Sequence, residues 1–472
     1  MAKFRGLSRL DGVGQAALVA RGELTASDLL DAFAERLEAL NALLRVVPAV
    51  DLERARAAKV PPGPFAGVPF LVKEVTPYPG LRWSCGSRVF AGNVAGPETR
   101  TPYIGRIDES GLVTVGKSAA SEFGLLGSTE TLLEGVTHNP WDLSLSAAGS
   151  SGGAAAAVAA GIVPLAHAND GGGSIRIPAS VCGLFGFKPS RTRCVPASLP
   201  SEFGALVSDH CVSRTVRDSA LFLSVTEDRA GPLPAVGYVR EPLARSLRIA
   251  TWTRTLLGEE PEPAVRRAVD DAAGLCAALG HRVEPVASPD LDGAALGDAF
   301  FIVAGAAVAG LVELVDRLRG HPVQRDELEP FSWALVDELE RRGPGALPAA
   351  RAAFAAGTER YLETIRGYDA VLTPTLATTP WRLGHLSPVL PREELLRRTG
   401  RTVGYTPIHN IAGCPAMSVP LHWTEEGIPI GVHFAAAPGA DALLLGLAYQ
   451  LEEARPWAER WAPFSYPRLF EA

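Results

Sequence analysis

One stretch of this chain decides its fold and its chemistry: Gly149–Pro178, which reads GSSGGAAAAVAAGIVPLAHANDGGGSIRIP. A Ser-Ser-Gly-Gly cluster opens an alanine-rich run, and an apolar segment then leads to three glycines before Ser174. Consecutive glycines let the backbone approach a ligand closely and aim several N–H groups at one point. Such a turn beside a hydroxyl can form an oxyanion hole, so the stretch predicts an acyl-transfer hydrolase.

The composition indicates a large protein with a sizeable core. The chain has 472 residues, of which 47% are hydrophobic and 21% charged. This size fits one very large domain or two fused ones, and we expect a single domain over residues 1–472. The net charge of −7 and the absence of basic blocks interleaved with aromatics argue against a nucleic-acid partner.

The terminal and apolar segments favour a cytoplasmic protein. The start of the chain, MAKFRGLSRLDGVGQ, contains no apolar leader, which argues against secretion. The longest uncharged apolar run, residues 299–312, is too short to cross a bilayer, so it predicts a buried helix and no membrane partner. Six cysteines show no metal-ligand spacing, so they are expected to be reduced thiols and indicate no metal site: Cys85, Cys182, Cys194, Cys211, Cys276 and Cys414.

Lysine usage marks one residue for chemistry. The chain has five lysines against forty arginines, so it takes arginine wherever a plain positive charge is enough. A lysine kept inside an apolar segment indicates a task that needs a neutral amine, which arginine cannot supply. Lys73 in GVPFLVKEV is that residue.

Apolar segments of strand and helix type alternate along the chain. This alternation predicts an α/β protein, an α/β/α sandwich with a large mixed β-sheet core covered by helices on both faces. Residues 67–194 would hold the core of the site, and residues 230–400 a peripheral helical subdomain. Expected strands cover residues 67–75, 112–115, 162–168, 247–251, 282–286, 369–374, 415–420 and 428–435. The longer expected helices cover residues 25–40, 101–110, 152–160, 213–227, 262–279, 295–318, 331–342, 348–366 and 440–453.

Two short motifs suggest other chemistries. Gly111–Ser118 matches the phosphate-loop pattern GxxxxGK[ST], but its apolar, β-branched interior favours an extended strand. Residues 149–153 match GxSxG, in which Ser151 would be the nucleophile of an α/β-hydrolase elbow. That elbow needs a buried strand directly before it, and the preceding WDLSLSAA is a poor candidate.

A third constellation combines Lys73, Ser150 and Ser174. Each residue also has a structural explanation: an ion-paired core lysine, a helix cap, and the N-cap of a short helix. Asp170 and Arg176 flank the glycine turn, and we expect them to support it by bonding loop amides or each other. The backbone N–H groups of Gly171, Gly172, Gly173 and Ser174 are the expected donors of the oxyanion hole.

The motifs around these residues resemble the amidase signature family. GSSGGAAAAVAAG and NDGGGSIRIPASVCGLFGFKP, with GVPFLVKE and NPWD upstream, carry the resemblance, which is strong over residues 67–189 and weaker over most of the chain. It implies a Ser-Ser-Lys triad with Ser174 as nucleophile, Ser150 as bridging serine after a cis peptide bond, and Lys73 as base. It also implies an amidohydrolase that acts on carboxylic amides and needs no cofactor.

The same resemblance leaves the substrate open. The motif NDGGGSIRIPAS is closest to enzymes that open cyclic or linear aminohexanoate amides, although broad-range amidases share it. Aliphatic amides, aryl amides, cyclic oligoamides, and carbamates or esters remain candidates for a small-molecule substrate. Residues 190–210 lack the string expected in an amidotransferase subunit, which favours a free-standing enzyme over a subunit or a non-catalytic role. Analogy with the family is compatible with a homodimer.

Overall fold

The computed structural model describes residue 4, residues 6–198 and residues 201–471. The α-helices are α1 (Gly12–Ala20), α2 (Ala26–Leu44), α3 (Leu52–Ala57), α4 (Pro102–Glu109), α5 (Gly152–Ala159), α6 (Arg176–Cys182), α7 (Val216–Thr226), α8 (Pro263–Ala278), α9 (Gly293–Arg319), α10 (Pro330–Arg342), α11 (Ala346–Ile365), α12 (Arg392–Thr402), α13 (Pro407–Ile411), α14 (Asp441–Ala454) and α15 (Tyr466–Leu469). The strands are β1 (Ala49–Val50), β2 (Pro69–Lys73), β3 (Val113–Ser118), β4 (Glu130–Thr131), β5 (Gly135–Val136), β6 (His138–Asn139), β7 (Asp142–Ser146), β8 (Leu165–Asp170), β9 (Phe185–Lys188), β10 (Ser208–Ser213), β11 (Arg248–Thr251), β12 (Arg282–Pro285), β13 (Ala370–Pro374), β14 (Ala416–Trp423) and β15 (Pro429–Ala435).

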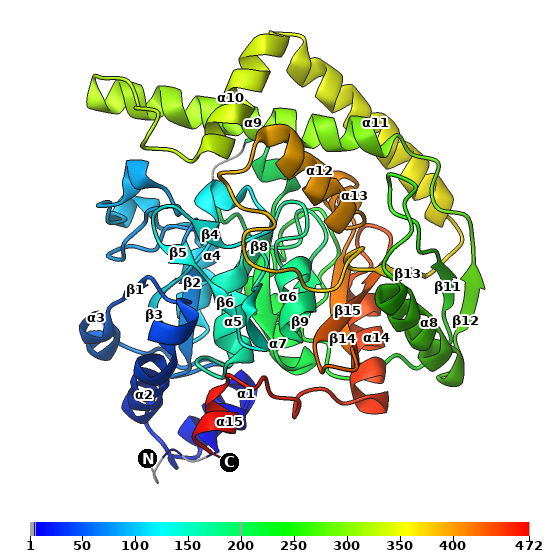
Figure 1. Ribbon diagram of the computed structural model, residues 1–472. Coiled ribbons are helices and arrows are strands. Elements are labelled where there is room, and N and C mark those ends of the chain that lie inside the picture. Colours follow the sequence, from blue (N-terminus) through cyan, green and yellow to red (C-terminus); the bar gives the residue numbers. More distant parts are fainter. Residues whose placement is uncertain (1–3, 5, 199–200, 472) are drawn as a thin grey trace.

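An eight-stranded mixed sheet runs through the middle of the molecule (Figure 1). Its strand order is β12-β11-β13-β15-β14-β9-β10-β8. The β11–β12 and β11–β13 pairs are parallel, and the other pairs are antiparallel. The expected mixed sheet is therefore confirmed, and its β8 edge ends at Asp170, where the glycine turn begins.

A small three-stranded sheet lies beside that edge. Its order is β1-β3-β2, and β2 carries Lys73 at its end. All five residues of β2 are buried, and the Lys73 backbone N–H donates to His167 Nδ1 of β8 at 3.3 Å. The Gly111–Ser118 stretch contains β3, also fully buried, so its apolar interior forms a strand rather than a phosphate-binding loop.

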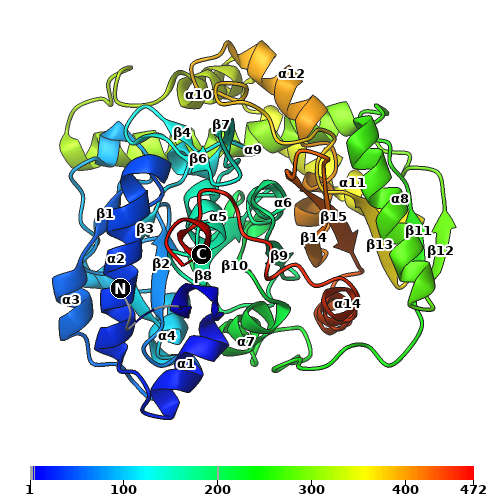
Figure 2. The same ribbon diagram turned by 60° about the horizontal axis from the view of Figure 1, so that its bottom comes forward.

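Helices cover both faces of the large sheet. Figure 2 shows α5 and α6 on one side of the arc of strands and α7 and α14 on the other. The alanine-rich α5 packs with α6 in one hydrophobic cluster, and its small side chains let backbones approach closely. α7, α8 and α14 form a second cluster against β14 and β15. The predicted layers are thus confirmed.

Three long helices, α9, α10 and α11, lie at the outer side of the molecule (Figure 1). Within residues 230–400, β11, β12 and β13 belong to the central sheet, and the division of this range into a subdomain stays a prediction. The expectation that residues 299–312 form a buried helix is only partly met. By length and composition α9 is the one helix among the described residues that could cross a membrane, and 39% of its most apolar window is buried.

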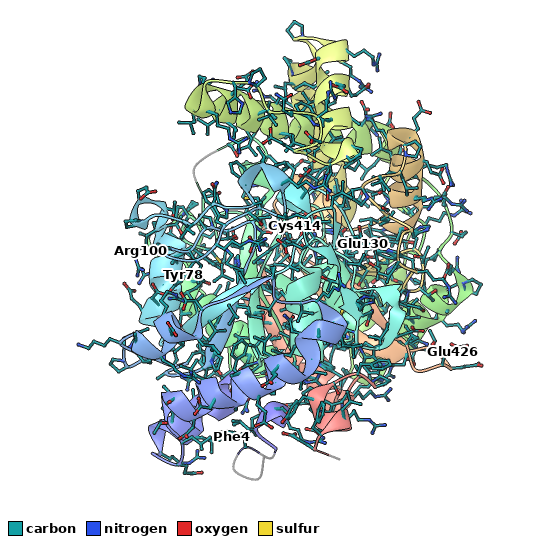
Figure 3. All side chains as sticks on the ribbon, turned by 60° about the vertical axis from the view of Figure 1, so that its left-hand side comes forward. Phe4, Tyr78, Arg100, Glu130, Cys414 and Glu426 are labelled. Carbon is teal, nitrogen blue, oxygen red and sulfur yellow. The ribbon has the colours of Figure 1, made fainter. Side chains whose placement is uncertain are left out.

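The six cysteines are free thiols, as expected. Five are buried and Cys194 is half-buried. Cys414 lies in the interior, whereas Glu426 points outward from the turn between β14 and β15 (Figure 3).

The two ends of the described chain meet at one side of the molecule (Figure 1). The carboxylate of Glu471 accepts hydrogen bonds from the Gly6 backbone N–H at 3.1 Å and from the Ser8 hydroxyl at 2.7 Å. Residues 6–9 and 467–471 are therefore held together by direct contacts.

Candidate active site

Lys73 lies at the end of β2 with its amine inside the protein. Its Nζ donates to Ser150 Oγ at 2.7 Å and to Asn169 Oδ1 at 2.6 Å. Burial lowers the pKa of Lys73 to about 7, although the carboxylates of Asp209 and Asp170 act in the opposite direction. The structure therefore brings two of the three predicted triad residues into direct contact and leaves the amine able to be neutral at physiological pH.

Ser150 follows a cis Gly149–Ser150 peptide bond, as the family resemblance implied. The segment before α5 runs close to other backbone: a Cβ added at Gly149 would lie 2.5 Å from the Ser128 carbonyl oxygen. The Thr129 hydroxyl donates to the Ala148 carbonyl at 2.8 Å and accepts from the Gly152 N–H at 3.0 Å. The glycine and the threonine together fix the place of Ser150 Oγ opposite Lys73.

The glycine turn is held by a buried ion pair. The carboxylate of Asp170 accepts hydrogen bonds from the Gly173 N–H at 2.6 Å and the Ile175 N–H at 3.2 Å. Arg176 donates to the same carboxylate through Nε and Nη2, both at 2.8 Å. Burial alone would raise the pKa of Asp170, but the Arg176 guanidinium outweighs it and holds that pKa well below its ordinary value. Asp170 and Arg176 thus hold the loop from its two flanks.

This geometry changes the predicted set of oxyanion donors. The Gly173 N–H already donates to Asp170, so it is not free for a ligand. Within the described parts of the chain, the N–H groups of Gly171, Gly172 and Ser174 have no hydrogen-bond partner. Gly173 serves the turn in another way: its φ is +136°, and a Cβ there would lie 2.3 Å from Thr406 Oγ1.

Ser174 is half-buried on the turn. It lines the same cavity as Ser150 and Asn169. Its hydroxyl makes no hydrogen bond to any of the described residues. The third predicted triad residue thus lines the same cavity as the buried Ser150 and has a hydroxyl that is unpaired among the described residues.

Ser151 does not have the position of the nucleophile in an α/β-hydrolase elbow. β7 ends at Ser146, and the residues up to Ser151 form no strand, although a nucleophile elbow needs a strand directly before its serine. Ser151 is buried at the N-cap of α5, and its hydroxyl donates to the Asn169 carbonyl at 3.4 Å. It does not line the cavity.

Several residues of the site were not found from the sequence. Asn169 contacts Lys73 directly, and Asn410 donates through Nδ2 to the Asp170 carbonyl at 2.7 Å and to its carboxylate at 3.0 Å. Asn169 lies inside the NDGGGS stretch, next to Asp170, which could have drawn attention to it. Asn410 is 240 residues away from Asp170 in sequence, and nothing in its surroundings points to the turn.

Metal binding has no support in the described ranges 4, 6–198 and 201–471. They contain no group of three or more His, Cys, Asp or Glu side chains that could hold a metal ion.

Comparison with known proteins agrees with this geometry. The family model described as Amidase matches residues 27–445. The chain belongs to the amidase family. It is 37% identical over 470 residues to the putative amidase AmiC of Mycobacterium tuberculosis (strain ATCC 25618 / H37Rv), with 97% of each chain covered. The amidase signature resemblance seen in the motifs is thereby confirmed.

Two further comparisons involve one enzyme activity. This amidase family member is 34% identical over 484 residues to the 6-aminohexanoate-cyclic-dimer hydrolase of Pseudomonas sp. (strain NK87), covering 95% of this chain and 96% of the relative. A solved structure of 6-aminohexanoate cyclic dimer hydrolase with its substrate superposes with a TM-score of 0.88 at 31% identity, covering 97% of this chain and 99% of that one. The chain is accordingly a hydrolase of carboxylic amide C–N bonds other than peptide bonds.

Proposed function

We propose that this amidase works through an acyl-enzyme on Ser174, with Ser150 as proton relay and Lys73 as base. The hydrogen bond of 2.7 Å between Lys73 Nζ and Ser150 Oγ carries the proposal, because it joins a buried amine with a pKa of about 7 to a hydroxyl at the cavity wall. A base is most useful when its pKa lies near the working pH. The substrate is a small-molecule amide.

The proton path follows from this contact. Neutral Lys73 takes the proton of Ser150 while Ser150 takes that of Ser174, whose oxygen forms a bond to the amide carbonyl carbon. The carbonyl oxygen becomes an oxyanion that accepts hydrogen bonds from the free N–H groups of Gly171, Gly172 and Ser174. The C–N bond then breaks, and the leaving amine takes a proton through Ser150. Water attacks the acyl group on Ser174 by the same path and releases the acid.

Asp170 and Arg176 support this chemistry without touching the substrate. Their ion pair fixes the Gly173 and Ile175 N–H groups, so the neighbouring free N–H groups keep a constant direction. A donor that is already oriented costs no reorganisation when the oxyanion develops.

Replacement of the nucleophile tests the proposal. We expect Ser174→Ala to lose hydrolysis of every amide while its circular dichroism and melting temperature stay near those of the unchanged chain. A fluorophosphonate probe should label Ser174 in the unchanged chain, as read by peptide mass mapping, and should not label the variant. Ser151→Ala is the matched control and should keep both labelling and turnover.

Two results would contradict the proposal. Turnover by Ser174→Ala would show that Ser174 is not the nucleophile. Loss of turnover in Ser151→Ala alone would favour the α/β-hydrolase elbow with Ser151 as nucleophile. An unlabelled chain that hydrolyses no small amide or ester would instead indicate a non-catalytic or amidotransferase-subunit role.

A further inference from the structure

The cavity beside Ser150 and Ser174 has an apolar wall. Its volume is about 390 Å³, and its walls come from residues near 123–127, 203–207, 256–257, 293–301 and 396–411. Among the described lining residues, Asp298 is the only charged one.

Aromatic rings lie directly against the glycine turn. A Cβ added at Gly172 would lie 3.0 Å from the ring of Phe300, and one at Gly171 would lie 3.6 Å from the ring of Phe203. The two rings contact each other edge to face, with centroids 5.9 Å apart. The group attached to the amide carbonyl would therefore meet aromatic carbon rather than polar atoms on this side.

The single charge at the cavity is already paired. Asp298 lies on α9, and its carboxylate accepts two hydrogen bonds from the Arg342 guanidinium of α10, the one to Oδ1 at 2.7 Å. A substrate ammonium would have to compete with a two-point arginine contact, and a substrate carboxylate would find no cation among the lining residues.

We infer that the site takes neutral amides with an apolar alkyl or aryl acyl group and discriminates against acyl groups that carry an ammonium or a carboxylate. The inference rests on the proposed function, since it concerns the acyl group that Ser174 would accept. Its physical basis is that a charge moved from water to an apolar wall without a partner loses hydration worth several kcal/mol.

Three 4-nitroanilides of equal chain length test the inference: the hexanoyl, 6-aminohexanoyl and 5-carboxypentanoyl compounds. At pH 8 we expect kcat/KM for the hexanoyl anilide to exceed both others by about 100-fold, the effect of losing part of one ion's hydration. Should turnover be too slow to rank, protection of Ser174 from the fluorophosphonate probe gives the same order.

If kcat/KM for the charged anilides lies within tenfold of the value for the hexanoyl anilide, the inference is overturned. A higher kcat/KM for the 6-aminohexanoyl compound would assign Asp298 as the partner of the substrate ammonium. These results differ from failure of the proposed function, in which Ser174 is neither labelled nor needed for turnover. Phe300→Ala should lower the hexanoyl-to-acetyl ratio of kcat/KM about tenfold. Phe354→Ala, in the same hydrophobic cluster but outside the cavity wall, should leave that ratio unchanged.

A second, independent observation concerns Asn169. Its side-chain oxygen lies 2.6 Å from Lys73 Nζ, and its backbone carbonyl oxygen lies 3.4 Å from the same nitrogen. A neutral lysine amine has two N–H groups and one lone pair. If both N–H groups donate to Asn169, the lone pair is left for Ser150 Oγ, the remaining neighbour of Nζ.

The geometry points to Asn169 as a positioning residue that turns the lone pair of neutral Lys73 toward Ser150. This inference also rests on the proposed function. The charged or titratable groups around Lys73 are Asp170 and His167 of β8, Asp209 of β10 and Lys117 of β3. Asn169 is uncharged, so it accepts hydrogen bonds from both N–H groups of the amine without stabilising the ammonium form as a carboxylate would.

Two substitutions of Asn169 test this role through the pH dependence of kcat/KM, because one adds a negative charge beside the Lys73 amine and the other removes a hydrogen-bond acceptor. Asn169→Asp would place a carboxylate beside the amine, so the acid limb should move up by about one pH unit or more. Asn169→Ala removes one hydrogen-bond acceptor, so the acid limb should not move to higher pH. We expect kcat to fall about tenfold with KM nearly unchanged. Asn139 is a buried asparagine with three hydrogen bonds outside the cavity, so Asn139→Ala should lower stability without moving the acid limb.

An acid limb that stays fixed in Asn169→Asp, in a variant whose Ser174 is still labelled, would overturn the positioning role. Loss of labelling and turnover in the unchanged chain would instead overturn the proposed function. If Asn169→Asp does not fold, an unchanged kcat in Asn169→Ala is equally decisive against the role.

Discussion

At the scale of single residues, the chemistry depends on the environment of one amine. The same burial that hides Lys73 from water makes its neutral form accessible near pH 7, because a charged amine loses hydration inside the protein. Arginine would stay charged at that position, which agrees with the retention of lysine in a chain that otherwise prefers arginine.

The first prediction is a pH profile. Lys73 is a base only when unprotonated, so kcat/KM should rise about tenfold per pH unit below pH 7 and level off above it. Lys73→Arg should lower kcat/KM by about 1,000-fold at every pH, because a guanidinium does not accept the proton. Stopped assays from pH 5 to 9 measure both effects. The exposed Lys59→Arg is the control, and an active Lys73→Arg would contradict the assignment.

Residues joined by local sequence were predictable, and those joined by tertiary contacts were not. Lys73 stood out as a rare lysine in an apolar strand, and Asp170, Ser174 and Arg176 share one turn. Asn410 reaches that turn from 240 positions away, and Phe300 reaches it from α9. Long-range packing of this kind leaves no pattern in a single sequence. The hydrogen bond from the Gly173 N–H to the Asp170 carboxylate was also not predictable from the sequence, because it depends on the rotamer of Asp170.

At the scale of elements, the glycine turn and the start of α6 behave as one unit. Arg176 contacts Asp170, Asn410 through its Oδ1 at 2.7 Å, and the Thr406 carbonyl at 3.0 Å. It therefore ties β8 and α6 to the α13 region.

The second prediction separates the role of Arg176 in the site from its role in stability. Arg176→Lys keeps a charge but loses the two-point contact, so we expect a loss of about 3 kcal/mol in unfolding free energy and a fall of about tenfold or more in kcat. Arg193→Lys is the matched control, because Arg193 is a buried arginine paired with Asp441 and Glu227. It should lose similar stability with kcat nearly unchanged. Equal kcat in the two variants would argue against a role for the ion pair in the turn.

The third prediction concerns the contact between η5 (Glu122–Gly124) and α10. Burial and the neighbouring Glu122 raise the pKa of Glu329 to about 8. The folded protein therefore keeps a proton on Glu329 between pH 4.5 and 8 that the unfolded chain has lost, so stability falls as the pH rises through this window. Glu329→Gln should melt higher than the unchanged chain at pH 9 and equally at pH 5. The exposed Glu340→Gln should show no such difference.

Strands and helices with strong patterns were predicted well. Helices near 293–319, 330–342 and 441–454 and strands near 248–251 and 429–435 appear where expected. β9 and β10 were not predicted, because Phe185–Lys188 is short and Ser208–Ser213 begins with three consecutive polar residues, although it lies between two other strands of the sheet. β8 begins three residues later than expected, after Pro164, which lacks the N–H that a strand interior uses.

At the scale of the whole molecule, the site costs stability. The pKa of Lys73 falls from 10.5 to about 7 on folding. In the window between these values the unfolded chain holds a proton that the folded protein has lost, so stability rises with pH. The cost at pH 7 and below is roughly 3–5 kcal/mol, from 1.36 kcal/mol per unit of pKa.

The fourth prediction follows from this cost. Lys73→Met removes the buried amine, and at pH 7 it should stabilise the protein by about 2 kcal/mol, less than the full cost because the hydrogen bonds to Ser150 and Asn169 are lost. The gain should shrink toward pH 10. Denaturant unfolding at pH 6, 7, 8.5 and 10 measures it, with Lys59→Met as control. A variant that is less stable at all four pH values would contradict the prediction.

The contact of Glu471 with Gly6 and Ser8 allows the chain to be rewired. A short flexible peptide between residues 471 and 6 would close the backbone into a ring with little loss of entropy, because those positions already touch. New ends could then be opened at Glu425 and Glu426, in the exposed turn after β14. Such a circular permutant would keep the order of its strands in space while β15 and α14 moved from the end of the polypeptide to its beginning.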